Sequence, residues 1–198
     1  CCHHMHWQLN NFSNVLLCGT GSKCLSTNIG FGGTKDPKIF ELLRYLTDAY
    51  SNATTINPAQ AAASLAQLSI LRSSEGVERR RKVTENYNYL RKKLEANGHR
   101  IIGNPCAIMP LFIGNEIISR LSCRLMMDSG IHVNSVEYPV VKIGQSRIRI
   151  CLFPQHTKAH LDQFVTIFEK CMAKSKIIME KSISQYEADM KEKTEAKL

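Results

Sequence analysis

The stretch GIHVNSVEYPVVKIGQSRIRICLFPQHT, residues 130–157, decides the expected fold of the C-terminal half of the chain. Apolar residues recur at close to alternate positions in two places: Ile131, Val133, Val136, Ile148, Ile150 and Leu152. This spacing predicts two strands, because side chains along a strand point to one face and then the other. Pro139 and Gly144 lie between the two groups and are typical of a turn or loop.

Two arginines fall on the second of these strands. Arg147 and Arg149 are two residues apart, so a strand places both side chains on one face. An arginine held on a rigid strand is suited to bidentate binding of a carboxylate or phosphate, which a lysine cannot match. From spacing alone, a strand-edge salt bridge remains an alternative role for Arg149.

A short apolar run near the start precedes a lysine. Residues 15–18 read VLLC and predict a buried strand, which leads directly into Gly19-Thr20-Gly21-Ser22-Lys23. In open α/β sheets, ligands bind just beyond the end of a strand, so Lys23 is a candidate for Schiff-base chemistry. That chemistry needs a partly desolvated amine. A surface-loop lysine remains the alternative from these residues alone.

Helical and extended patterns alternate along the rest of the chain. Asp36-Pro37 is suited to the first turn of a helix, and Asn97-Gly98 to a helix end. The spacing predicts helices over residues 36–50, 59–71, 77–96, 116–127 and 159–172, and further strands over 100–102 and 108–113. Strands with intervening helices make this an α/β or α+β chain.

Composition limits the function classes. The chain has 198 residues, 43% of them hydrophobic, and no apolar run long enough to span a bilayer, so we expect no membrane span. The net charge of +9 suits anionic partners. Most basic residues fall on amphipathic helices such as residues 78–93 and no nucleic-acid motif accompanies them, so we expect no nucleic-acid partner. The eight cysteines lack paired CxxC spacing, which favours reduced thiols and an intracellular, cytoplasmic location.

The two ends carry no assigned chemistry. Residues 1–7 read CCHHMHW, but neither a closing pair of ligands nor zinc-finger spacing follows, so we expect no metal site there. Residues 174–198 are rich in Lys and Glu, which is typical of a solvated helix or a disordered tail.

Two motifs together carry a resemblance. The first is Gly19-Thr20, any residue, Ser22-Lys23; the second is Tyr-Pro-Val-Val from Tyr138, Gly-Gln from Gly144, Arg-Ile-Arg from Arg147, and His156-Thr157. The chain resembles the α-oxoamine synthases, pyridoxal 5′-phosphate (PLP) enzymes that join an amino acid to an acyl-CoA. The resemblance implies the α/β fold of the PLP-dependent transferases of fold type I. It also implies a division into the end of the large domain (1–75), a connecting helix (76–98), a small domain (99–173) and the charged tail (174–198).

The resemblance also implies residue roles. Lys23 carries PLP and Thr20 binds its phosphate. Thr54, with Thr55 as the second choice, reaches the phosphate bound to the neighbouring subunit of a homodimer. Arg149 binds the substrate carboxylate. Glycine, serine or alanine and an acyl-CoA are the implied substrates, and decarboxylation usually follows.

The residues leave the family member and some alternatives open. Tyr138 to Val141 and Gly144-Gln145 are closest to glycine C-acetyltransferase, Asn57 to Gln60 favours the 8-amino-7-oxononanoate and serine palmitoyltransferase branches, and Val140 replaces a threonine of aminolevulinate synthases. Residues 24–33, CLSTNIGFGG, bring the glycines later than in similar enzymes. Because the resemblance covers roughly the second half of the catalytic core, the chain alone is expected to be a poor catalyst. A noncatalytic or truncated subunit is one alternative, and a basic nucleic-acid-binding protein is another.

Overall fold

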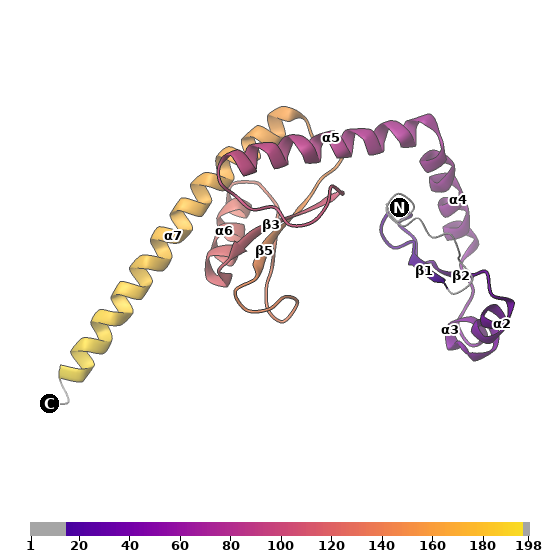
Figure 1. Ribbon diagram of the computed structural model, residues 1–198, viewed down its shortest axis with the longest axis horizontal. Coiled ribbons are helices and arrows are strands. Elements are labelled where there is room, and N and C mark those ends of the chain that lie inside the picture. The colour runs from indigo at the N-terminus through magenta and orange to yellow at the C-terminus, as the bar shows by residue number, and fades with distance from the viewer. Residues whose placement is uncertain (1–14, 196–198) are drawn as a thin grey trace. The chain divides into compact units, whose positions relative to one another are not determined.

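The computed structural model describes residues 15–195, so the cysteine- and histidine-rich start lies outside the described residues. The chain divides into two compact units, with residues up to Glu78 in the first and residues from Arg79 onward in the second. Figure 1 shows the elements of each unit. The six described cysteines are all free. Within the described range, no helix has an apolar stretch long enough to cross a bilayer.

The first unit begins with a two-stranded antiparallel sheet. Strand β1 (Leu16–Thr20) pairs with β2 (Gly30–Thr34), so that Leu16 lies opposite Thr34 and Thr20 opposite Gly30. The predicted strand is therefore present, but the prediction that it is buried is wrong: the side chains of Leu16 and Leu17 are 47% and 56% exposed. The hairpin has only two strands, and the described residues that pack against it leave Leu16 and Leu17 exposed.

Three helices follow in the first unit. They are α2 (Pro37–Leu46), α3 (Asp48–Ser51) and α4 (Pro58–Arg72). The Asp36 carboxylate caps α2 by accepting from the backbone N–H of Lys38 at 2.8 Å, and the Asn57 side chain caps α4 in the same way. The single helix predicted over 36–50 is divided at Thr47, whose backbone is extended.

Helix α5 (Ser74–Ala96) starts three residues earlier than predicted, at the end of the first unit, and provides the core stripe of the second. Tyr87, Leu90 and Leu94 are fully buried along this stripe. The helix ends as expected: Gly98 has a positive φ of 83°, and the backbone N–H of His99 bonds to the Leu94 carbonyl at 3.0 Å.

The core of the second unit lies between a sheet and helices. Strands β3 (Ile108–Gly114), β4 (Asn134–Val136) and β5 (Ser146–Cys151) form an antiparallel sheet in the order β3-β5-β4. One face of the sheet is buried against the helices and includes Met109, Leu111, Ile148 and Ile150. The strand predicted over 100–102 is only an isolated bridge from Ile101 to Leu111, with one backbone hydrogen bond to β3 on each side of it.

Two helices complete the second unit. Helix α6 (Glu116–Asp128) and helix α7 (Lys158–Glu195) pack against one another, and both contribute side chains to the core. Helix α7 runs well past the predicted end at residue 172, so residues 174–195 of the charged tail are helical (Figure 1).

Candidate functional site

The predicted lysine lies in a turn that is closed at its base. Lys23 is exposed and follows β1. The backbone N–H of Gly21 donates to the Ile29 carbonyl at 2.7 Å, and that of Thr27 donates to the Gly21 carbonyl at 3.2 Å. The backbone N–H of Ser26 donates to the Lys23 carbonyl at 3.2 Å. The hairpin therefore holds both ends of the Lys23 segment, while the Lys23 side chain is exposed to solvent.

Two hydroxyl groups lie beside this lysine in the chain. The Thr20 and Ser22 side-chain oxygens are 3.2 Å apart, and the backbone N–H of Ser22 donates to the Thr20 hydroxyl at 3.2 Å. Ser22 was not among the predicted cofactor-binding residues, although it is part of the Gly-Thr-x-Ser-Lys motif that pointed to the site. A primary amine with two exposed hydroxyls fits an aldehyde that bears a phosphate group.

Only glycine fits between Thr20 and Ser22. A Cβ atom at Gly21 would lie 2.2 Å from Cγ2 of Ile29 and 2.9 Å from the Thr27 hydroxyl oxygen. Since real Cβ atoms do not approach other heavy atoms so closely, a side chain here would force the turn open. The Gly-Thr-Gly-Ser-Lys sequence is thus matched to the compactness of this turn.

Thr54 and Thr55 lie in the same unit as the lysine turn, and no hydrogen bond joins them to it. Both are exposed in the irregular segment before α4. Neither makes a hydrogen bond with another of the residues 15–195. Their predicted role toward the neighbouring subunit remains a prediction.

Arg149 lies in the second unit, on the central strand β5. It is opposite Pro110 of β3 and Asn134 of β4, so it is not at the strand edge where a structural salt bridge was the alternative. Its side chain is exposed, and it forms no hydrogen bond or ion pair with any residue that the structure describes. The buried side chains of Ser146, Ile148 and Ile150 confirm that both arginines point to the opposite face.

The environment of Arg149 differs from that of Arg147. Arg147 donates from Nε and from its terminal nitrogen to the Gln145 carbonyl, at 3.2 and 3.1 Å. Arg149 instead lines a groove of about 580 Å³, together with His132, Asn134 and His156. Burial, and then the nearby His160, lower the pKa of His156. The groove therefore presents the Arg149 guanidinium beside the polar side chains of His132, Asn134 and His156.

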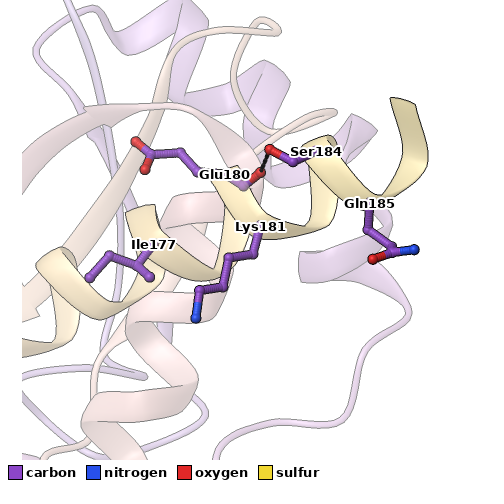
Figure 2. Close-up of a pocket in the computed structure, with 5 residues that line it drawn as sticks. All are labelled: Ile177, Glu180, Lys181, Ser184 and Gln185. Atoms are coloured by element: carbon purple, nitrogen blue, oxygen red, sulfur yellow. Dashed lines mark hydrogen bonds between the residues drawn. The ribbon is translucent and has the colours of Figure 1, made fainter. Parts of the chain in front are cut away.

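A second surface depression contains none of the predicted residues. It lies along one face of α7 and is lined by Ile177, Glu180, Lys181, Ser184 and Gln185 (Figure 2). The Ser184 hydroxyl donates to the Glu180 backbone carbonyl at 3.0 Å, a bond within the helix itself. Within residues 15–195, no group of three or more His, Cys, Asp or Glu side chains is arranged to hold a metal ion.

Comparisons with known proteins add to this geometry. The family model for "Aminotransferase class I and II" matches residues 5–168. The chain is 28% identical over 155 residues to 2-amino-3-ketobutyrate coenzyme A ligase of Salmonella typhimurium, with 78% of this chain and 38% of that protein covered. It is 31% identical over 133 residues to the mitochondrial 5-aminolevulinate synthase of Neurospora crassa, with 67% and 21% covered.

A solved structure shares the fold. A serine palmitoyltransferase from S. paucimobilis with a bound PLP–myriocin aldimine superposes with a TM-score of 0.72 at 22% identity, and covers 82% of this chain and 40% of its own. The chain thus spans well under half the length of the relatives that it matches.

Proposed function

Because this chain belongs to the aminotransferase class I and II family, and within it to the PLP-dependent α-oxoamine synthases, we propose that it supplies the lysine, the phosphate-binding hydroxyls and the carboxylate-binding arginine of an enzyme that condenses an amino acid with an acyl-CoA. The cofactor is PLP, as in the serine palmitoyltransferase that shares the fold. The match covers 38% of 2-amino-3-ketobutyrate coenzyme A ligase. We propose that the remaining parts of the site correspond to regions of such enzymes that this chain does not match.

The observation that carries this proposal is the Lys23 turn. An exposed primary amine follows a strand in a loop that backbone hydrogen bonds close on both sides, and two hydroxyls lie next to it in sequence. A surface lysine without a function would not need a turn so tight that only glycine fits at position 21, between the hydroxyl residues Thr20 and Ser22. The donor set suits an aldehyde and a phosphate on one small molecule.

Each residue then has a distinct task. Lys23 Nζ would hold the cofactor and would serve as the base for the proton at the substrate Cα. The Thr20 hydroxyl, with Ser22 Oγ 3.2 Å from it, would donate to the cofactor phosphate. When bound, PLP supplies an electron sink that makes a bond to the substrate Cα easier to break.

Arg149 orients the amino acid. Its guanidinium donates two parallel hydrogen bonds to the substrate carboxylate, and this fixes which Cα bond is aligned for cleavage. The absence of a competing carboxylate among the described residues supports this role, because a paired arginine would first have to give up its partner. The backbone of Arg149 is already ordered by pairing on both sides of the central strand, so binding does not have to order it.

The proposed substrates are glycine, serine or alanine with an acyl-CoA, and the proposed assembly is a homodimer in which Thr54 or Thr55 reaches the neighbour's cofactor phosphate. The active-site lysine is exposed in this chain. Desolvation of that lysine therefore has to come from the rest of the enzyme, which agrees with the expectation that the chain alone is a poor catalyst.

Covalent labelling tests the proposal directly. The purified chain is incubated with PLP, reduced with borohydride and mapped by peptide mass spectrometry. We expect a pyridoxyl group on Lys23 at cofactor concentrations that leave Lys38, an exposed lysine of the same unit, unlabelled. Lys23→Ala should abolish the specific label, and Lys38→Ala should leave it unchanged.

Labelling that follows exposure alone would contradict the proposal. In that case the lysines of the chain acquire the pyridoxyl group at similar rates, and Lys23→Ala removes only its own share. Such a result would favour a noncatalytic or truncated subunit, which keeps the fold but does not bind the cofactor covalently.

A further inference from the structure

We propose that Thr27 and Ser64 are positioning residues for Lys23: their hydrogen bond fixes the lysine turn to helix α4. The two side-chain oxygens are 3.0 Å apart, although the residues are 37 positions apart in the chain. This inference rests on the proposed role of Lys23, but the link itself is a feature of the fold and is measurable without any cofactor.

Burial in the first unit is concentrated at this link. Among the described non-glycine side chains of residues 15–78, the buried ones are those of Leu25, Thr27 and Ser64. Thr27 and Ser64 are each 5% exposed, whereas many larger apolar side chains of the unit, such as Leu17 and Phe31, are more than half exposed. A buried hydroxyl is costly unless it is paired, so these two groups stabilise each other and specify one arrangement.

The link reaches the lysine through short steps. The backbone N–H of Thr27 donates to the carbonyl of Gly21, two residues before Lys23. The Thr27 hydroxyl also limits the space beside Gly21, where a Cβ atom would lie 2.9 Å from it. On the other side of the turn, Ser26 adopts a positive φ of 46° and both its N–H and its hydroxyl donate to the Lys23 carbonyl.

Leu25 and Thr27 are the buried non-glycine residues of the turn, and Thr27 is the one that bonds to helix α4. An anchor of this kind holds the backbone of Lys23 in place while the side chain stays exposed. Precise positioning of a cofactor needs both a fixed backbone and an accessible amine.

Two measurements on the full chain test this. Hydrogen exchange of the peptide that covers residues 21–29 is followed without PLP, and the rate of pyridoxyl labelling at Lys23 is followed at low PLP concentration. We expect Thr27→Val and Ser64→Ala each to raise exchange about tenfold and to slow the labelling of Lys23 several-fold, as loss of one buried partner predicts. Thr27→Ser should keep the values of the unchanged chain.

The matched controls identify a shared bond. Ser69→Ala removes an exposed hydroxyl from the same helix and should alter neither measurement. The double variant Thr27→Val/Ser64→Ala should be no worse than either single variant, because both remove the same hydrogen bond. Strictly additive effects, or unchanged exchange in the single variants, would overturn the link.

The two proposals fail in different ways. A Lys23 without label in the unchanged chain overturns the proposed function. A specifically labelled Lys23 whose labelling rate is the same in Thr27→Val and Ser64→Ala overturns the positioning role alone.

Discussion

At the scale of single residues, the two arginines of β5 share a face but differ in what they bind. Arg147 is occupied by the backbone carbonyl of Gln145, whereas Arg149 has no partner among the described residues. Proximity on one strand therefore does not make the two equivalent. Of these two arginines, Arg149 is therefore the one proposed to bind the substrate carboxylate.

Arginine-to-lysine substitutions separate the two roles. In the PLP-loaded enzyme, Arg149→Lys keeps the positive charge but loses the two parallel N–H donors of the guanidinium. We therefore expect the dissociation constant for the amino acid to rise about 10- to 100-fold. The measurement is the concentration dependence of the change in cofactor absorbance on adding glycine, serine or alanine. Arg147→Lys is the control and should change this constant little. An equal weakening by both substitutions would contradict the assignment.

At the scale of elements, helices α5 and α7 are joined by a polar contact at one point. Lys93 on α5 lies 2.5 Å from the Asp162 carboxylate on α7, and the Tyr89 hydroxyl donates to the same carboxylate at 2.9 Å. The hydrogen bond from Lys93, followed by that from Tyr89, holds the pKa of Asp162 below its ordinary value.

This pKa shift predicts a pH dependence of stability. Because the pKa of Asp162 is lower in the folded chain than in the unfolded one, its contribution is present above the unfolded value of about 4 and is lost as pH falls through the folded value. We expect Asp162→Asn to lower the urea midpoint at pH 7 slightly and to make no difference near pH 2, since the pair is exposed to solvent. Asp128→Asn, which removes an exposed carboxylate 3.5 Å from Arg124, is the comparison. A larger loss at pH 2 than at pH 7 would contradict the sign of the shift.

The elements also show what sequence patterns can and cannot predict. The period-two spacing correctly predicted β5 and the common face of Arg147 and Arg149, because alternation is a property of one strand. The Asp36-Pro37 and Asn97-Gly98 boundaries were local as well, and both were confirmed. By contrast, the exposure of Leu16 and Leu17 depends on which layers surround a strand. The contact between Thr27 and Ser64 depends on how a turn packs on a distant helix, and neither residue has a distinctive local pattern.

At the scale of the whole molecule, the predicted site is distributed over more than one compact unit and, by our proposal, over two chains. Lys23, Thr20, Thr54 and Thr55 belong to the first unit and Arg149 to the second. In the proposed homodimer, Thr54 or Thr55 of one subunit would complete the site around Lys23 of the other.

Mixed dimers test this division. A chain with Thr54→Val/Thr55→Val keeps Lys23, and a chain with Lys23→Ala keeps both threonines. At low PLP concentration, each chain measured by itself should show little labelling at position 23. Mixing the two should restore labelling of Lys23 on the threonine-deficient chain, since one site of the hybrid dimer is complete. A partner that carries Lys23→Ala together with both threonine substitutions should restore nothing. Equal restoration by both partners, or by neither, would contradict a shared site.

The alternation along β5 has a final consequence for how this position is inherited. The residues that surround Arg149 in sequence, Ile148 and Ile150, are fully or almost fully buried on the other face. A one-residue slip of the strand would bring the arginine into the apolar core and both isoleucines into solvent. An insertion or deletion that shifts this register is therefore expected to destabilise the second unit, whatever Arg149 binds. A substitution can replace the arginine without moving the isoleucines, but a shift by one position along the strand cannot.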